Sequence, residues 1–426
     1  MMSSEHSENW WESTLDFAAK SDIGMRRTNN QDSHREVPAA SPRLWRERGH
    51  VFVLADGMGA HAAGELASRL ATETIASSYL KRSTENPKDA LKNAVLDAHE
   101  KIRRRGDEEE AFHDMGTTAD TLVLLPEGAM IAHVGDSRTY RLREGSYDQL
   151  TFDHSLLWEL TRSKRFSPDK IPAHIPKNVI IRSLGPTAHP EVDLEGPFPL
   201  QKGDVFLQCS DGLSGLVSDS EMGQILSLFP PSEAAEALVN LTNLRGGPDN
   251  VTMIIVKVLG IPDPESGTTR NDAYAKRPPL SALAWGFLVA ALGLFLLAFL
   301  LAFSIRWWSL IPFVAAFGSV GLFFLTAWRS LFPKEEKRTI TPMGKGPYVQ
   351  TSAKADPKFA EKLFDIYSQL EKAVQTRQMT IDRNLLQRRI SAARAAFQKK
   401  GFGEAIRLTI QNINQLMKTL KQQGGA

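Results

Sequence analysis

The stretch Val51-Phe52-Val53-Leu54-Ala55-Asp56-Gly57 joins a short β-branched and apolar run to an aspartate and a glycine. The run predicts a buried strand, and the Asp-Gly pair predicts the turn that ends it. Similar runs recur through the first 258 residues, each bounded by Gly, Asp, Asn or Pro: 121–124, 130–134, 205–207 and 251–258. Segments with helical spacing lie between some of them, at 63–80, 87–105 and 232–244. This order predicts an α+β sandwich rather than a regular βαβ sheet.

Four aspartates lie directly after or before such apolar runs, and each is followed by Gly, Ser or Asn: Asp56, Asp136, Asp211 and Asp249. A single Asp-Gly pair would be an ordinary turn. Because strand ends meet at one edge of a sheet, four such carboxylates can gather around hard cations, and oxygen ligands suit Mg²⁺ or Mn²⁺. The sequence has no cysteine pair and no histidine-rich cluster, which argues against zinc.

The chain has 426 residues and a nearly balanced charge, with 51 Lys and Arg against 49 Asp and Glu. Basic residues outnumber acidic ones from Ser330 onward, so the first 260 residues are net acidic. An acidic half argues against nucleic acid as the main ligand. The single cysteine, Cys209, excludes an intrachain disulfide and fits a reducing compartment. The first 17 residues lack the apolar centre of a signal peptide.

Two long apolar segments follow, at 280–305 and 307–328, with Arg306 between them. A helix needs about 20 apolar residues to cross a bilayer, so the segments predict two transmembrane helices. The basic flanks, Lys276 and Arg277 before and Arg329 and Lys334 after, place both ends in the cytoplasm. We therefore expect a multi-pass protein of the inner membrane, in contact with the lipid bilayer. Two buried helices of a soluble domain are the alternative.

The last region, 356–423, predicts a small all-α domain. Fourteen Lys and Arg face six Asp and Glu between Lys354 and Lys421, and apolar residues recur at helical spacing in three stripes. Three amphipathic stripes need burial, so we expect this domain to dock a partner or self-associate. Contact of its basic residues with anionic lipid is the alternative. The remaining segments are predicted as an N-terminal tail (1–14) and two linkers (259–279 and 329–355).

Eight segments within 15–258 resemble, in wording and order, the metal-dependent protein phosphatases of the PPM type, also called type 2C. They are 21–32, 55–59 with 64–65, 115–118, 133–138, 150–155, 182–185, 209–213 and 247–252. The resemblance implies two antiparallel sheets packed face to face, with helices outside and a metal site at one end. The similarity is to the bacterial branch of the family. About 170 residues of the chain lie outside the region that resembles it.

The resemblance also implies roles for individual residues. Asp56, with the carbonyl of Gly57, would bridge two Mn²⁺ or Mg²⁺ ions. Asp211 and Asp249 would hold the first ion, and Asp32 would serve the second. A third, weaker ion would match Asp136 together with Asp211.

Arg27 would clasp the substrate phosphate, because a guanidinium fork can meet two phosphate oxygens at once. Its neighbour Arg26 is the alternative. A hydroxide bridging the two ions would attack phosphorus in line, so Arg27 and Asp56 are the predicted catalytic residues. No cysteine nucleophile is needed, and Cys209 is interpreted as a core residue.

Two positions depart from the family pattern. Gln31 replaces a glutamate that most relatives carry, which predicts weaker affinity for the second ion. Met58 stands where some relatives have a histidine acid, so a metal-bound water would protonate the leaving group. His61 is interpreted as a surface residue and His154 as structural. The basic segment 162–178 matches a mobile flap that either recruits phosphopeptide or has no role in choosing substrates.

The expected function is hydrolysis of phosphoserine and phosphothreonine in proteins, opposing a serine/threonine kinase. Two alternatives stay open. The chain can be a catalytically weak scaffold that binds phosphoproteins, or its substrate can be a small phosphate ester.

Overall fold

The computed structural model describes residues 10–60, 62–162, 179–261, 282–304, 310–331, 341–377, 379 and 381–423. The chain divides into two compact units. The first runs to Pro262 and resumes at Ile340, and the second is Asp263–Thr339. Each unit is described by itself below.

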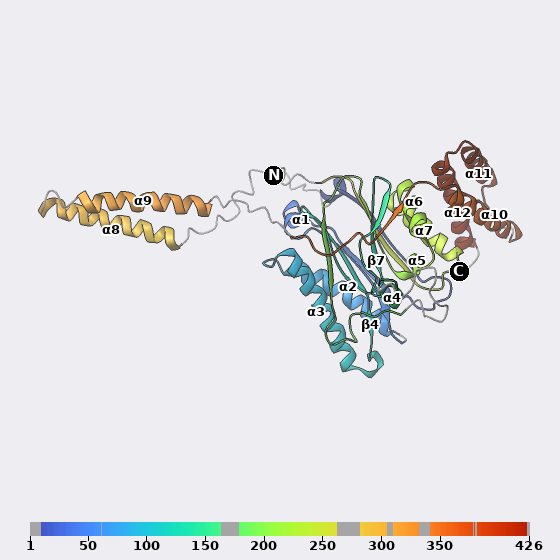
Figure 1. Ribbon diagram of the computed structural model, residues 1–426, viewed down its shortest axis with the longest axis horizontal. Coiled ribbons are helices and arrows are strands. Elements are labelled where there is room, and N and C mark those ends of the chain that lie inside the picture. Colours follow the sequence, from blue (N-terminus) through green and yellow to red (C-terminus); the bar gives the residue numbers. More distant parts are fainter. Residues whose placement is uncertain are drawn as a thin grey trace, which may run out of the picture. The chain divides into compact units, whose positions relative to one another are not determined.

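Two antiparallel sheets form the centre of the first unit (Figure 1). In order across the first sheet, the strands are β1 (Leu15–Asp22), β11 (Val251–Val258), β10 (Val205–Cys209), β7 (Arg138–Arg143), β8 (Ser146–Gln149) and β12 (Val349–Ser352). The second sheet contains β2 (Asp32–Val37), β3 (His50–Met58), β5 (Ala119–Leu125), β6 (Gly128–Val134) and β9 (Asp193–Phe198), with β4 (Gly116–Thr117) paired to β3. The predicted antiparallel α+β sandwich is confirmed.

Strand β3 shows why the sandwich forms. Successive side chains on a strand point to opposite faces. Phe52 and Leu54 join the core between the two sheets, where Phe206 and Ile254 of the other sheet also lie. The alternate residues of β3, Val51 and Val53, join a second core under the helices. The continuous apolar run in the sequence is therefore a strand that is buried on both faces.

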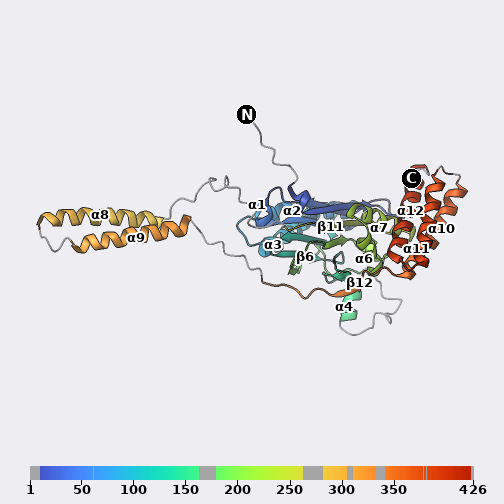
Figure 2. The ribbon, with the colours of Figure 1, turned by 90° about the horizontal axis from the view of Figure 1, so that it is seen from above.

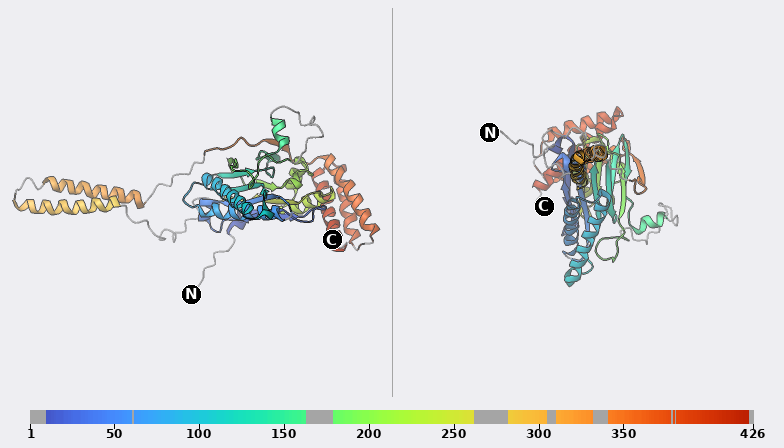
Figure 3. Two further views of the ribbon diagram at one scale, coloured as in Figure 1. Left: turned by 90° about the horizontal axis from the view of Figure 1, so that it is seen from below. Right: turned by 90° about the vertical axis from the view of Figure 1, so that its left-hand side faces the viewer.

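Helices cover both outer faces of the sandwich (Figure 3). The helices α2 (Ala63–Lys81) and α3 (Pro87–Glu108) pack on the second sheet, and α6 (Asp219–Leu228) and α7 (Pro231–Leu244) pack on the first. Helix α6 begins at a capping box, in which Ser218 and Glu221 bond each other's backbone N–H groups. The shorter helical elements are η1 (Trp10–Ser13), α1 (Pro42–Arg48), η2 (Glu110–Phe112), α4 (Leu156–Arg162) and α5 (Asp211–Ser214).

The predicted C-terminal helical region consists of α10 (Pro357–Thr376), α11 (Arg383–Gln398) and α12 (Phe402–Gln423). Its apolar stripes lie in one core with residues of α6 and α7, so the helices and the sandwich share buried surface. Figure 2 shows α12 beside α6 and α7. The stripes are thus buried within the chain, and they give no ground for expecting a partner or a second copy.

Within the segment predicted as a linker, 329–355, the described residues 341–355 make specific contacts with the sandwich. Strand β12 pairs with β8 and extends the first sheet. Ahead of it, the Glu195 carboxylate accepts hydrogen bonds from the backbone N–H groups of Lys345 and Gly346, both at 3.1 Å, and from the Tyr348 hydroxyl at 2.5 Å. A side chain at Gly344 would collide with that carboxylate, and φ is +70° there, so this turn requires glycine.

The second unit contains the helices α8 (Ala282–Ser304) and α9 (Leu310–Leu331), which pack against each other. The rings of Phe295 and Phe317 meet edge to face, with their centroids 5.8 Å apart. Within the described residues, no helix has both the length and the apolar character that a membrane crossing requires. This finding contradicts the predicted transmembrane hairpin, and with it the predicted inner-membrane location and contact with the bilayer.

Two neighbouring leucines of α11 test the packing of the C-terminal helices. Leu386 is buried in the shared core, whereas Leu385 is 37% exposed. We expect Leu386→Ala to lower the free energy of unfolding by about 2–5 kcal/mol, because it removes buried methyl groups and leaves a cavity. Leu385→Ala is the matched control and should cost less than about 1 kcal/mol. Urea unfolding followed by circular dichroism measures both, and equal losses would contradict the packing described.

Candidate active site

The ends of β2 and β3 bring the first two aspartates together. Asp32 and Asp56 are directly opposite each other in the ladder between these strands. The backbone of Asp56 is fixed by Thr118, whose hydroxyl accepts from the Asp56 N–H at 2.8 Å and whose own N–H donates to the Asp56 carbonyl at 2.9 Å. Next to it, a Cβ at Gly57 would lie 2.0 Å from the carbonyl oxygen of Gly64, so only glycine allows α2 to approach β3 this closely.

The other sheet supplies Asp211 and Asp249. Asp211 begins α5, two residues after the end of β10, and Asp249 lies two residues before β11. Ser210 ties this edge to the first pair of aspartates, since its hydroxyl donates to an Asp32 carboxylate oxygen at 2.9 Å. The same hydroxyl accepts from the N–H of Thr252 at 3.0 Å. One end of each sheet therefore contributes to a single site.

Electrostatic effects show that the carboxylates act on one another. Removal from water raises the pKa of Asp56 well above its usual value, and the charges of Asp32, Asp211, Asp136 and Asp249 raise it further. For the same two reasons the pKa of Asp32 rises to about 6 and that of Asp136 to about 7. Like charges held close together resist ionisation. Without a cation, this site holds protons at a pH where free aspartates have lost them.

The chemistry of the carboxylates, rather than a preformed set of ligands, suits a divalent cation. In the described residues no group of three or more His, Cys, Asp or Glu side chains is placed so that it could hold a metal ion. However, one oxygen of Asp32 and one of Asp136 are buried with no hydrogen-bond partner in the structure. An unpaired buried carboxylate oxygen is costly unless a proton or a cation meets it. The donors are all oxygens, which suits Mg²⁺ or Mn²⁺.

Arg27, rather than Arg26, faces this cluster. A terminal nitrogen of Arg27 donates to an Asp249 carboxylate oxygen at 2.7 Å, and half of the Arg27 side chain is exposed to solvent. The hydrogen bond to Asp249 and the nearby charges of Asp56 and Asp211 raise the pKa of Arg27. Arg26 is exposed and makes no ion pair within 4.0 Å among the described residues. The geometry favours Arg27 as the residue that can meet a phosphate.

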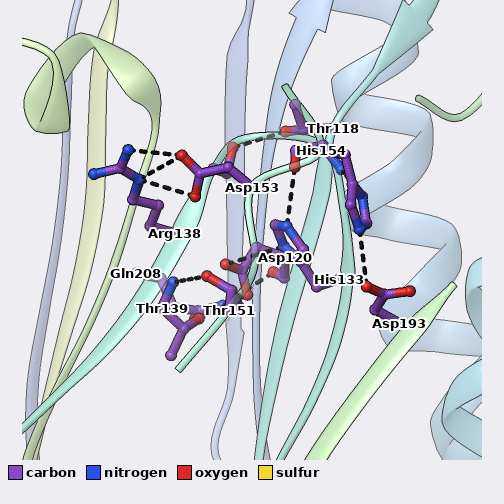
Figure 4. A network of polar contacts seen from close by, with 12 residues as sticks. Thr118, Asp120, His133, Arg138, Thr139, Thr151, Asp153, His154, Asp193 and Gln208 are labelled. Carbon is purple, nitrogen blue, oxygen red and sulfur yellow. Dashed lines mark hydrogen bonds and ion pairs between the residues drawn. The ribbon is translucent and has the colours of Figure 1, made fainter. Parts of the chain in front are cut away.

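The turn that carries Asp136 rests on a buried polar network (Figure 4). The N–H of Gly135 donates to Nδ1 of His154 at 3.1 Å, so Nε2 of His154 carries the proton and donates to Asp193 at 2.9 Å. Burial lowers the pKa of His154 to about 4, which keeps the ring neutral. Beside it, His133 lies 3.0 Å from the carbonyl oxygen of Gly135. The structural interpretation of His154 therefore agrees with its contacts.

Several supporting residues were not predicted from the sequence, namely Thr118, Ser210, Asn250 and Thr252. All of them stand inside the segments that resemble the phosphatase family, which was the available signal. Their role depends on contacts between residues far apart in the chain. Thr118 and Asp56 are 62 positions apart, and Ser210 and Asp32 are 178 positions apart.

Of the remaining predicted positions, some lie within the described residues and others do not. Cys209 is fully buried in β10, and burial raises the pKa of its thiol, so its interpretation as a core residue agrees with the structure. Met58 ends β3, beside β4. His61 and the flap residues 163–178 lie outside the described residues.

Comparison with known proteins decides the family. Residues 25–241, about half of the chain, match the family described as Protein phosphatase 2C. The chain belongs to the protein phosphatase 2C family. It is therefore an enzyme of the protein phosphatase class, and the predicted family is confirmed.

Bacterial relatives of this protein phosphatase 2C are similar over the same region. Protein phosphatase PhpP of Streptococcus pneumoniae is 34% identical over 248 residues, which are 57% of this chain and 98% of PhpP. The serine/threonine phosphatase stp of Listeria innocua is 34% identical over 243 residues, covering 56% of this chain and 94% of stp. The crystal structure of PstP/Ppp from Mycobacterium tuberculosis is 32% identical, with a TM-score of 0.50 over 58% of this chain and all of that one.

The raised pKa values predict how metal-free stability changes with pH. Because the folded-state values of about 6 for Asp32 and about 7 for Asp136 exceed the unfolded value of about 3.9, the folded chain binds more protons between about pH 4 and 7. The free energy of unfolding in EDTA should therefore fall as the pH rises through this window.

Thermal unfolding at pH 5, 6, 7 and 8, with EDTA or Mn²⁺, measures this effect. Mn²⁺ should raise the melting temperature more at pH 7 than at pH 5, because it binds ionised carboxylates. Asp136→Asn should flatten the metal-free pH dependence. A melting temperature in EDTA that rises from pH 5 to pH 7 would contradict the proposed repulsion.

Proposed function

We propose that this protein phosphatase removes phosphate from serine and threonine residues of other proteins and needs divalent metal ions to do so. The observation that supports this proposal most directly is the meeting of five aspartates from both sheets, two of them with an unpaired buried oxygen. Such a site is unfavourable alone and becomes favourable around cations. The relatives named as serine/threonine phosphatases support the choice of substrate.

In this proposal each aspartate has a place. Asp56 and the carbonyl of Gly57 would hold two ions, with Asp211 and Asp249 on the first and Asp32 on the second. Asp136 and Asp211 would hold a weaker third ion. Bound ions would supply charge neutralisation for the phosphoryl oxygens and activation of water.

The chain's own residues would orient the substrate. Arg27 is half-exposed at the edge of the cluster, and its guanidinium fork can hold two phosphate oxygens. Its present partner, Asp249, is also a proposed metal ligand. An Asp249 carboxylate that turns toward a cation would leave Arg27 free to bind the phosphate. Met58 offers no proton at its position, so a water held in the metal site would have to protonate the leaving alkoxide.

The substrates would be phosphorylated proteins, and the enzyme would oppose a protein serine/threonine kinase. A catalytically weak scaffold that binds phosphoproteins is the competing function. A folded chain that binds a phosphothreonine peptide and releases no phosphate in any metal would favour the scaffold. A preference for small phosphate esters over phosphopeptides would point to a different hydrolase.

Replacement of one proposed metal ligand tests the mechanism. We expect the full chain to release phosphate from a phosphothreonine peptide with Mn²⁺ or Mg²⁺ and to lose this activity in EDTA. Asp211→Asn should lower kcat/KM by at least about a hundredfold, since even the partners of metal ligands contribute about 10–100-fold. Asp107→Asn on the exposed end of α3 is the control and should keep full activity. Activity that survives both EDTA and Asp211→Asn would refute the metal mechanism.

Gln31 gives a test that should improve metal binding. Its backbone carbonyl accepts from the N–H of Gly57, and its side-chain nitrogen donates to the carbonyl oxygen of Gly59 at 3.2 Å, so it lies against the proposed bridging residues. Gln31→Glu adds a negative charge there and should lower the Kd for Mn²⁺ about tenfold or less, because it also loses the bond to Gly59. Calorimetric titration with Mn²⁺ measures this, and an unchanged or weaker affinity would show that Gln31 does not limit metal binding.

A further inference from the structure

The loop that carries Arg27 is held in place by hydrogen bonds from residues outside the loop. This loop, residues 23–31, joins β1 to β2. Asn250 closes both of its ends, because its side-chain nitrogen donates to the carbonyl oxygens of Ile23 and Asn29, each at 3.0 Å, and its side-chain oxygen accepts from the N–H of Gln31 at 2.9 Å. The place of Arg27 is therefore set by contacts with the segment that carries Asp249.

Asp22, the last residue of β1, fixes the beginning of this loop. One of its carboxylate oxygens accepts from the N–H of Gly24 at 2.9 Å and from the side chain of Asn243 at 3.0 Å. The backbone at Gly24 has φ of +79°, and a Cβ there would lie 2.2 Å from the carbonyl oxygen of Asp249. The N–H of the next residue, Met25, donates to the backbone carbonyl oxygen of Gly247 at 2.7 Å. A shift at Asp22 would therefore move the loop against the backbone beside Asp249.

The other oxygen of Asp22 faces the C-terminal helix. The Lys421 ammonium of α12 lies 3.5 Å from it. Helix α7 also connects Asp22 with α12. Its Asn243 bonds Asp22, and its Asn240, one turn earlier, donates to Asn414 of α12 at 3.0 Å. The family match ends at residue 241, whereas α12 begins at Phe402.

From these contacts we propose that Asp22 is a positioning residue for Arg27 and that Lys421 makes this positioning depend on the docked C-terminal helices. The inference rests on the proposed function, because it takes Arg27 as the phosphate-binding residue. Asp22 is the last residue before the loop and would act only through it. One of its hydrogen bonds holds the backbone N–H of Gly24, the other joins it to Asn243 of α7, and its charge pairs with Lys421 of α12.

Variants of the full chain separate a positioning role from a purely structural one. Three readouts are needed: KM and kcat for a phosphothreonine peptide, the Kd of that peptide, and the melting temperature. Asp22→Ala should raise both KM and Kd about tenfold, since it removes two hydrogen bonds to a charged acceptor, with kcat within about twofold. Asp22→Asn keeps an acceptor for Gly24 and loses the charge, so it should raise KM only about two- to threefold, as should Lys421→Met.

A double-mutant comparison identifies the route of the effect. If Asp22 acts through Arg27, Asp22→Ala should add nothing to the loss of peptide affinity in an Arg27→Ala background. Matched controls are Lys418→Met on the exposed side of α12 and Asp16→Ala at the far end of β1, and both should leave KM unchanged.

Three results would overturn the inference. An effect of Asp22→Ala that persists in the Arg27→Ala background, or that lowers kcat and the melting temperature together, would show a structural role. An unchanged KM in Lys421→Met beside a raised KM in Asp22→Ala would remove α12 from the mechanism. A different result would show that the proposed function itself is wrong. In that case the unaltered chain shows no turnover in any metal, and the peptide Kd still tests Asp22.

Discussion

Mutual repulsion among five aspartates at one end of the sandwich is the constraint on which the site depends. The strands must hold Asp32 opposite Asp56 and bring Asp211 and Asp249 from the other sheet, although each ionised carboxylate opposes the next. Threonine and serine hydroxyls at Thr118 and Ser210 hold the backbone and the oxygens in place. Holding these carboxylates together lowers the stability of the folded protein. The packed core of the two sheets compensates for this loss, as is usual for functional sites.

The same repulsion among the carboxylates favours the binding of cations. Carboxylates that raise one another's pKa bind cations more strongly once they ionise, because a cation relieves several unfavourable contacts together. Arg27 already meets part of this negative charge through Asp249. In the proposed mechanism a phosphate group, which carries negative charge itself, would enter only where bound cations and Arg27 outweigh the aspartates. The arrangement therefore suits hydrolysis of phosphate esters better than binding of a neutral ligand.

The C-terminal helices α10, α11 and α12 belong to the same compact unit as the sandwich. Their apolar faces fill a core with α6 and α7, and strand β12 extends the first sheet. Once a helix buries its apolar stripe in this way, the stripe no longer predicts a partner. The buried carboxylate of Glu195, which accepts three hydrogen bonds from residues 345–348, shows how firmly this segment is held. The sequence of this segment, which is rich in Gly, Pro and charged residues, is by itself typical of a linker.

The sequence by itself determined the sandwich and its helices, because strand periodicity and helix spacing are local patterns. The eight family segments predicted which aspartates form the proposed metal site. The sequence also predicted Arg27 as the phosphate-binding residue, with Arg26 as the alternative. The tertiary structure favoured Arg27, since only the fold places Asp249 within 2.7 Å of it. Only the fold could place Asn250 around the Arg27 loop, β12 beside β8, and Lys421 opposite Asp22, because each contact joins residues more than 190 positions apart. Such pairings arise from packing, and no local pattern encodes them.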